Sequence, residues 1–403
     1  MQEKYSINNF LISLVAFCLF FIILILGCND DKRVSESKSH DTDRLSKIYA
    51  LPISVISPPG NQMTEAKVKL GRLLFFDPIL SGEKDVACAT CHHPSNGFAE
   101  SRDLSIGVNG SGFGGNRAFK EPNQIPFVKR NAHTVLNTAY NGIDLSAKYD
   151  PEEAPMFWDD RVKSLEGQAL EPLKALEEMR GMRYSESEIL DVVVARLQEI
   201  GEYEQLFSLA FPTDPEPVSI DNLAKAIAAY ERTLVSNNSR FDAFKRGDEN
   251  ALSEAEKEGM QTFLDVGCAK CHNGPMFSDY QMHVLGVPDN PKLAERDLGF
   301  ELTNAFRTAS LRNLRFTFPF MHNGSMKSIK EILEFYEDIA NGKSRNPHIP
   351  IEDIDPLARS LKLKVKDFGP ITNFLLSLND DNFDQSIPET VPSKLPVGGE
   401  VGL

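Results

Sequence analysis

The chain has 403 residues, of which 41% are hydrophobic and 25% are charged, so it is long enough for two or three domains of ordinary globular composition. Its formal net charge is −15, and this charge argues against a nucleic-acid partner because it would repel a phosphate backbone. Beyond its N-terminus, the composition favours an acidic, soluble protein with a hydrophobic core.

The N-terminus holds the one long apolar run of the chain, which covers residues 10–27 and follows a short start containing Lys4. A small residue, Gly27, stands directly before Cys28, and polar residues follow at once. This arrangement is typical of a lipoprotein signal that is cleaved before the cysteine and acylated on its thiol. We therefore expect residues 1–27 to be a signal peptide. A lipid on Cys28 would hold the protein in the cell envelope, facing the periplasm. An uncleaved anchor helix over the same run is the alternative.

A tether, a helix and a loop come next along the chain. Residues 28–47 are polar and poor in apolar side chains, which is tether composition. From Thr64, apolar residues recur at roughly helical spacing until Asp77-Pro78 ends the pattern. Residues 104–126 contain a cluster of glycines and two prolines, so we expect a long irregular loop that is functional or mobile.

Two further helices are predicted in the rest of the chain. Apolar residues repeat at three and four positions after Ser219, a predicted N-cap, and continue to Leu234. A capping box at Ser253–Glu256 begins another helix, which runs to about Leu264. Long alternating strands are scarce. The sequence therefore predicts a mainly α fold with long irregular loops.

Two cysteine patterns of the same kind stand 180 positions apart. They are Cys88-Ala89-Thr90-Cys91-His92 and Cys268-Ala269-Lys270-Cys271-His272. Two thiols on one turn can reach the two vinyl groups of a porphyrin, and the histidine that follows can bind the iron from the proximal side. We therefore expect two covalently bound hemes c in two cytochrome c-like domains, residues 48–248 and 249–385. Residues 386–403 are expected to form a loose tail.

These cysteines also match other kinds of site. Four cysteines in an exported protein could form two disulfides, and a two-residue spacing also occurs in zinc sites and redox dithiols. The histidine after each pair, and the 176 residues between the pairs, favour heme attachment over these alternatives.

Further motifs stand in order around the heme motifs. They cover residues 70–78, 130–137, 157–161, 231–235 and 310–313, the last continued by 321–325. Together they resemble the diheme cytochrome c peroxidase and MauG family, and the resemblance runs from about residue 65 to 378. It implies that the first heme reacts with peroxide, that the second relays electrons from an outside donor, and that a calcium ion sits between them.

The resemblance also assigns three catalytic residues. Trp158 matches the tryptophan between the hemes, Gln168 the distal glutamine and Glu178 the catalytic glutamate. Heterolysis of the peroxide O–O bond needs a base that takes one proton and an acid that returns it, and a partly buried carboxylate can do both. Without the resemblance, Trp158 would be interpreted as a core aromatic and Glu178 as a solvated surface residue.

Metal ligands are implied in the same way. Asn131 and the backbone carbonyls of Thr317 and Pro319 match the calcium-binding positions. Tyr336 falls at the distal-ligand position of the second heme, where family peroxidases commonly have methionine and the MauG type has tyrosine. An anionic phenolate there would lower the heme potential, although Tyr336 could also belong to an ordinary core stripe. His133 departs from the pattern, since the family usually has proline, and we interpret it as a satisfied structural histidine.

The first heme is expected to lack a second protein ligand. Many family peroxidases bind this iron at rest with a histidine from the loop after the first motif, and Val108 stands at that position. No histidine occurs from Pro94 to Ala132. We therefore expect an open first heme that reacts with peroxide in the ferric state, with the glycine-rich loop gating access.

Three functions fit these residues. The first is reduction of hydrogen peroxide to water with electrons from a small cytochrome or copper protein. The second is MauG-like chemistry, in which peroxide-oxidised iron draws electrons from residues of a protein substrate, and Tyr336 points toward it. The third is an electron-transfer lipoprotein without peroxide chemistry, which would not need Gln168 or Glu178. Homologues of this kind are often dimers, so a homodimer is open.

Overall fold

A computed structural model describes residues 48–144 and 148–402 of the chain. The predicted signal, the Cys28 acylation site and the tether at 28–47 lie outside the described residues. Residues 48–403 cluster as one compact unit, so the predicted boundary between residues 248 and 249 stays a prediction. Within the described ranges no helix is both long enough and apolar enough to cross a membrane.

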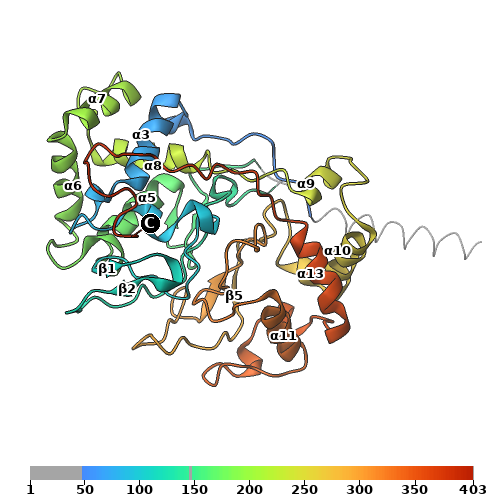
Figure 1. Cartoon of the computed structure of the whole chain (residues 1–403). Helices are drawn as coiled ribbons and strands as arrows, with labels where there is room; N and C mark the ends of the chain where they lie inside the picture. The colour runs from blue at the N-terminus through green and yellow to red at the C-terminus, as the bar shows by residue number, and fades with distance from the viewer. Residues whose placement is uncertain (1–47, 145–147, 403) are drawn as a thin grey trace, which may run out of the picture. The chain divides into compact units, whose positions relative to one another are not determined.

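Helices dominate the first half of this unit, in blue and green in Figure 1. They are α3 (Glu65–Phe76), α4 (Cys88–Cys91), α5 (Leu165–Lys174), α6 (Ile189–Gln198), α7 (Gly201–Ala210) and α8 (Ile220–Glu231). The Thr64 hydroxyl caps α3 at the predicted start of the helical pattern, and the Ser219 hydroxyl caps α8 as predicted. The two helices cross so closely that a Cβ at Gly71 would lie 1.8 Å from the carbonyl oxygen of Ala226. Only glycine permits this contact.

The second half repeats that crossing with other helices, in yellow to red in Figure 1. They are α10 (Glu254–Val266), α11 (Ile329–Ala340), α12 (Pro356–Arg359) and α13 (Phe368–Leu376), and the short helix α9 (Arg240–Lys245) precedes them in the connection from the first half. The predicted capping box of Ser253 and Glu256 begins α10. Helix α10 packs against α13, and a Cβ at Gly259 would lie 2.0 Å from the carbonyl oxygen of Pro370. Both halves therefore bring their first and last helices together through a glycine, and the mainly α prediction is confirmed.

Strands are few and short, and they pair in three antiparallel hairpins. The pairs are β1 (Gly110–Ser111) with β2 (Ala118–Phe119), β3 (Pro155–Met156) with β4 (Val162–Lys163), and β5 (Met282–Val284) with β6 (Ala305–Arg307). The first pair lies in the glycine-rich loop. The buried side chain of Arg117 holds that loop, because it donates to the carbonyl oxygens of Ile106 (2.6 Å) and Gly107 (2.8 Å). The loop is irregular as expected, but it is anchored.

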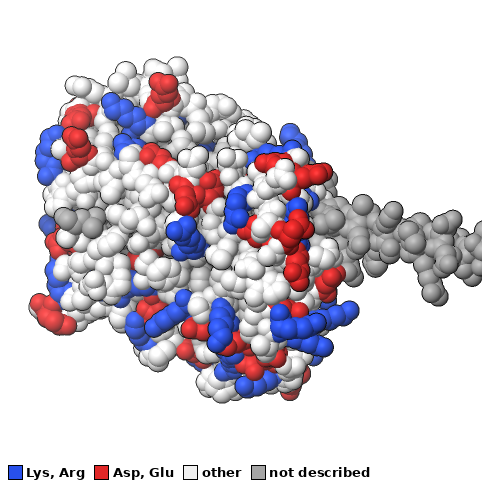
Figure 2. All heavy atoms as spheres, turned by 45° about the vertical axis from the view of Figure 1, so that its right-hand side comes forward, with Lys and Arg blue, Asp and Glu red and all other residues white. Residues whose placement is uncertain are grey.

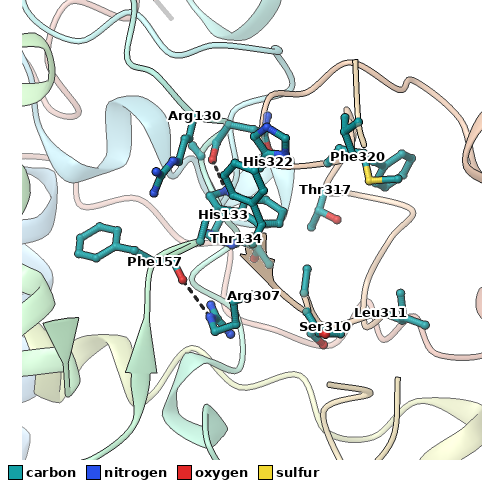
Figure 3. Close-up of a pocket in the computed structure, with 18 of the residues that line it drawn as sticks. Arg130, His133, Thr134, Phe157, Arg307, Ser310, Leu311, Thr317, Phe320 and His322 are labelled. Atoms are coloured by element: carbon teal, nitrogen blue, oxygen red, sulfur yellow. Dashed lines mark hydrogen bonds between the residues drawn. The ribbon is translucent and has the colours of Figure 1, made fainter. Parts of the chain in front are cut away.

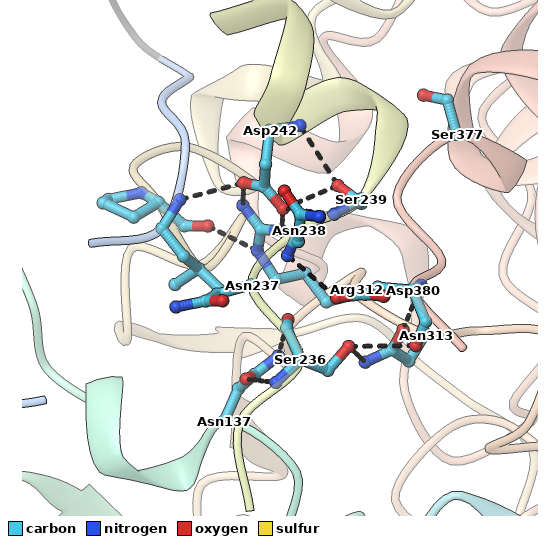
Figure 4. Close-up of polar contacts among 12 residues, drawn as sticks. Asn137, Ser236, Asn237, Asn238, Ser239, Asp242, Arg312, Asn313, Ser377 and Asp380 are labelled. Atoms are coloured by element: carbon cyan, nitrogen blue, oxygen red, sulfur yellow. Dashed lines mark hydrogen bonds and ion pairs between the residues drawn. The ribbon is translucent and has the colours of Figure 1, made fainter. Parts of the chain in front are cut away.

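Buried polar contacts join the two halves, as Figure 4 shows. Arg312 forms a two-fold ion pair with Asp242, at 2.9 and 3.0 Å, and both side chains are buried. Asn313 donates to the Ser236 hydroxyl (2.9 Å), and Asn137 exchanges hydrogen bonds with the backbone of Ser236. Because a buried charge must be paired to be stable, these contacts fix the linker between α8 and α9 against the second half.

The C-terminal segment differs from the expectation of a loose tail. It leaves α13 and crosses to the first half, where Figure 1 marks the C-terminus. Val391 and Val401 are buried, and the Ser393 hydroxyl donates to the carboxylate of Asp77 (2.6 Å). The Thr90 hydroxyl, within the first cysteine motif, donates to the carbonyl oxygen of Gly398 (2.7 Å). Composition alone could not reveal these contacts, because they join positions about 300 residues apart.

Charged side chains of both signs are interspersed on the face shown in Figure 2. On this face the net charge of −15 is not gathered into a single acidic patch. Docking of a charged partner is therefore not predicted from this view.

Candidate functional site

The two C-x-x-C-H motifs have the same local geometry. Cys88 to Cys91 form the single turn α4, and Cys268 to Lys270 form a 3₁₀ turn. Nδ1 of His92 lies 3.1 Å from the carbonyl oxygen of Phe98, and Nδ1 of His272 lies 2.9 Å from that of Phe277. A carbonyl can only accept, so Nδ1 carries the proton in both rings. The lone pair of each Nε2 is thereby left for a metal.

The cysteines of both motifs are unpaired, which argues against disulfides. Among the described residues, the only group with metal-ligand proximity is Cys271 with Asp279 and His283. The two cysteine pairs therefore do not share a zinc site. Both ring nitrogens of His283 are engaged by carboxylates, Asp355 at 2.7 Å and Asp279 at 3.1 Å. These contacts raise the pKa of His283 to about 11, and the trio is explained as an ion-pair cluster.

A continuous cavity joins the two motifs. Its wall includes His92 and His272, both cysteine pairs and most of the predicted site residues. Those predicted residues are Asn131, Trp158, Gln168, Glu178, Thr317, Pro319 and Tyr336. A long apolar cavity with a histidine from each half fits two hemes, and the structure brings together the residues that the sequence assigned to them.

Gln168 and Glu178 face the cavity beside the first motif. Gln168 lies in α5, which the Ser164 hydroxyl caps. Glu178 lies in the π-helical turn Leu176–Arg180, directly after α5. Burial, and to a lesser degree the neighbouring Glu177, raise the pKa of Glu178 to about 7. A carboxyl group with this pKa can both take and return a proton near neutral pH.

The glycine-rich loop supports the turn that carries Glu178. The backbone N–H of Val108 donates to the carbonyl oxygen of Glu178 (3.1 Å). A Cβ at Gly107 would lie 2.1 Å from that same oxygen, so only glycine permits the approach. Val108 itself is buried and does not line the cavity. This part of the loop therefore positions an acid–base group, a role that the sequence did not predict.

Glu231 is a second cavity carboxyl that the catalytic assignment missed. It ends α8, lines the cavity near Cys88, and is 4% exposed. Its Oε2 atom has no hydrogen-bond partner among the described residues, and burial raises its pKa to about 8. The signal was present in the sequence, because the block 231–235 belongs to the resemblance. Its neighbour Arg232 has a structural role and binds both carboxylate oxygens of Glu166.

Trp158 links the two halves of the cavity wall. Its indole N–H donates to the carbonyl oxygen of Asn131 (3.0 Å), and its own carbonyl accepts from the backbone N–H of Arg307 (2.8 Å). The imidazole of His133 stacks on the indole, with ring centres 4.0 Å apart and planes 26° apart. In Figure 3, His133 and His322 lie at the centre of this wall, between Arg130 and Arg307.

The interpretation of His133 as a satisfied structural histidine is wrong. Its Nε2 is buried without a partner among the described residues, and its ring lines the cavity. Burial, together with Arg307 and other positive groups nearby, holds the pKa of His133 well below its usual value. A proline at this position would leave no such nitrogen.

Tyr336 is the phenol of the second site. It lies in α11, lines the cavity and is close to Cys271 and Cys268. Burial raises its pKa, so its hydroxyl would ionise only with compensation from a metal. Met321, Met326 and His283 are the other side chains that the sequence offers as ligands of the second heme. Met321 lines the cavity, Met326 does not, and His283 is held by two carboxylates.

The predicted calcium residues line the same cavity. The amide N–H groups of Asn131 donate to the carbonyl oxygens of Arg102 (2.8 Å) and Asp103 (3.2 Å). The side-chain oxygen of Asn131 is therefore left as an acceptor, alongside cavity residues Thr317 and Pro319. Oxygen donors of this kind suit Ca²⁺, so the residues fit the ion.

Comparisons with known proteins agree with this geometry. Residues 65–250 match the family described as di-haem cytochrome c peroxidase. The chain is 33% identical to the methylamine utilization protein MauG of Methylorubrum extorquens, over 79% of this chain and 81% of that relative. It is also 33% identical to the cytochrome c551 peroxidase of Pseudomonas aeruginosa, over 80% of this chain and 86% of that relative.

Solved structures give the same result. A MauG-like protein associated with microbial copper homeostasis matches with a TM-score of 0.65 and 26% identity, covering 82% of this chain and 95% of that one. The diheme peroxidase BthA of Burkholderia thailandensis shares the fold, with a TM-score of 0.61 and 21% identity over 84% of this chain and 92% of that one. With both motifs and the acid–base groups on one cavity, the chain belongs to the di-haem cytochrome c peroxidase family and is an oxidoreductase of the peroxidase type.

Proposed function

We propose that this protein reduces hydrogen peroxide to water at the heme bound by His92, with electrons relayed through the heme bound by His272. A small periplasmic cytochrome or copper protein supplies the electrons. Each peroxide takes up two electrons and two protons and yields two waters. The observation that carries the proposal is the partly buried carboxyl of Glu178 on the cavity wall, whose pKa of about 7 suits proton transfer beside the first motif.

The bound heme iron supplies the electrons that break the O–O bond, while the chain supplies the protons and the binding geometry. In its ionised form, Glu178 takes the proton from the peroxide oxygen nearer the iron. It then returns that proton to the departing oxygen, which leaves as water. The Gln168 amide can donate a hydrogen bond to peroxide from the same wall. Apolar neighbours such as Ala169 and Ile227 keep bulk water away from these groups.

The first heme has an open face in this proposal. Val108 cannot bind iron, and its burial in the core away from the cavity supports the absence of a ligand from the loop. His272 and Tyr336 would hold the iron of the second heme, since the phenol lines the cavity near the second cysteine pair. An anionic phenolate makes that heme hard to reduce.

Further features of the proposal rest on the sequence. The hemes are attached covalently through Cys88, Cys91, Cys268 and Cys271, and a calcium ion is held by Asn131, Thr317 and Pro319. The protein is anchored by a lipid on Cys28 and faces the periplasm, where its electron donor diffuses. A homodimer stays a prediction.

Electron paramagnetic resonance and rapid mixing test the proposal directly. We expect a high-spin ferric signal from the isolated protein and a fast reaction with peroxide without prior reduction. In steady state, two molecules of reduced cytochrome c should be oxidised for each peroxide consumed. A wholly low-spin spectrum, with no reaction until one electron is added, would contradict the open first heme.

MauG-like oxidation of a protein substrate is the second candidate, and Tyr336 is the residue that favours it. In that case, peroxide should produce a long-lived oxidised state with little turnover of reduced cytochrome c. The same rapid-mixing experiment therefore separates the two functions.

A further inference from the structure

His133 occupies a place in the cavity wall that neither the peroxide chemistry nor the calcium site explains. Its ring lies flat against Trp158, the single tryptophan of the chain. It is also an electrostatic neighbour of His92, so it belongs to the first heme side of the cavity. The stack covers one face of the indole, while the hydrogen bond to Asn131 fixes the indole edge.

The unpartnered nitrogen of His133 needs an explanation. A buried polar atom without a hydrogen bond is destabilising, and because His133 lines the cavity, its partner can come from the group that fills the cavity. Nothing among the described residues bonds to Nε2.

The charges around His133 indicate which partner fits. Arg130, Arg161 and Arg307 all lie near the imidazole. Asp159 and Asp297 pair with Arg130, and Asp159 also pairs with Arg161. Arg307 is nearly fully buried, forms no ion pair among the described residues, and donates through Nε to the carbonyl oxygen of Phe157 (2.8 Å). The positive charge of Arg307 suits a carboxylate, and the propionates are the only carboxylates that a heme brings into the cavity.

We propose that His133 is a positioning residue that stacks on Trp158 and donates a hydrogen bond from its imidazole to a propionate of the first heme. It thereby couples the indole to the heme edge and sets how an electron is shared between the two hemes. The inference rests on the two hemes of the proposed function, but not on peroxide turnover.

Two substitutions separate the two contacts. His133→Phe keeps a flat ring for stacking but has no donor, whereas His133→Ala removes both. A donor that neutralises a propionate favours the ferrous state of the nearby heme, so its loss makes the first heme harder to reduce. In both variants, we expect the equilibrium for one electron shared between the hemes to shift toward the second heme by about tenfold. That factor corresponds to about 1.4 kcal/mol, the scale of one hydrogen bond to a charged group.

The indole is observed separately by ultraviolet resonance Raman spectroscopy, because a single tryptophan gives an unmixed spectrum. The indole bands should keep their wild-type positions in His133→Phe and move in His133→Ala. His133→Asn restores a donor and should recover part of the equilibrium shift. His93→Phe is the matched control, since His93 also has a buried, unpartnered Nε2 but does not line the cavity. This variant should change neither the electron distribution between the hemes nor the indole bands.

Both measurements are made on the holoprotein and need no activity assay. An electron distribution within twofold of wild type in His133→Phe would overturn the propionate contact. Unchanged indole bands in His133→Ala would overturn the positioning role. If the wild-type protein proves unable to turn over peroxide, the proposed function fails, but both readings on His133 remain valid.

Discussion

The two heme sites are built from the same local structure but have different surroundings. Each begins with a helix that crosses a partner through a glycine, Gly71 in one half and Gly259 in the other. Each then places a histidine whose Nδ1 is bound by the carbonyl oxygen of a phenylalanine. The proximal half of each site is therefore set by the fold.

The difference lies in the other groups that line the cavity near each motif. Gln168, Glu178 and Glu231 line the wall of the first site, and burial raises the pKa values of both carboxyls. The second site has Tyr336 and Met321, with no acid–base pair of this kind among the described cavity residues. The fold therefore builds the two sites alike, and in the proposed function a few further side chains decide which heme takes part in proton transfer.

Removing the cysteines of one heme motif at a time is the strongest test of the difference between the two sites. Replacing Cys88 and Cys91 by serine should abolish the reaction with peroxide, because the site with the acid–base groups then loses its heme. Replacing Cys268 and Cys271 should leave a single reaction of the ferric protein with peroxide but stop turnover with a donor. Mass spectrometry should show one heme addition in each variant. A peroxide reaction that survives the first change and not the second would reverse the roles assigned to the sites.

We expect the next largest effect from replacing the carboxyl of Glu178. Glu178→Gln should slow the peroxide step by about two to four orders of magnitude, the usual contribution of a positioned acid–base group. The wild-type rate should also fall below pH 7, since the first proton transfer needs the ionised form and the pKa is about 7. Rapid mixing across pH 5 to 9 measures both.

Glu177→Gln is the matched control for Glu178. Glu177 is the next residue in the same turn but does not line the cavity. Its negative charge contributes to the raised pKa of Glu178, so its loss should move the midpoint of the pH profile downward and leave the plateau rate unchanged. Equal losses of rate in the two variants would mean that the turn, and not the Glu178 carboxyl, matters.

Replacing Tyr336 tests the same difference at the second site, where we expect a smaller effect on turnover. Tyr336→Phe should change the ferric low-spin spectrum of the second heme and raise its potential, because a phenolate that stabilises ferric iron is removed. Potentiometric titration followed by optical absorption measures the change. Met321→Leu should leave the spectrum as it is. If the effects of the two substitutions were exchanged, the thioether would be the ligand.

Much of this arrangement could be predicted from the sequence, because its signals are local. The caps at Thr64, Ser219 and Ser253 and the two heme motifs lie within a few residues of the features that they specify. The grouping of Gln168 and Glu178 followed from the resemblance, and their short separation in sequence keeps them on one wall.

The remaining features could not be predicted, because they depend on contacts between distant segments. The C-terminal segment has no periodicity, yet the Asp77 carboxylate and the backbone of Gly398 hold it to the first half. The loop at residues 104–126 was expected to be mobile, but Arg117 anchors it. His133 was misjudged for the same reason, since its stacking on Trp158 joins residues 25 positions apart.

The smallest predicted effect concerns Glu231, and it tests whether the first site stores a second buried proton. Its pKa is about 8 in the folded protein, above the ordinary glutamate value of 4.5. The folded protein therefore holds this proton more tightly than the unfolded chain does. The stability from this group is complete below about pH 4.5 and is lost as the pH rises toward 8. The loss approaches, at most, about 1.4 kcal/mol per pH unit within that window.

Glu231→Gln mimics the protonated form at every pH and so removes this dependence. We expect the melting temperature of the variant, relative to wild type, to be higher at pH 8 than at pH 5. Thermal unfolding of the holoprotein, followed by circular dichroism, measures the difference. The exposed Glu249 provides the control, since Glu249→Gln removes an equal charge at the surface and should leave the pH profile unchanged. Parallel profiles for wild type and Glu231→Gln would mean that Glu231 is ionised in the folded state. In that case the first site would hold no second buried proton at Glu231.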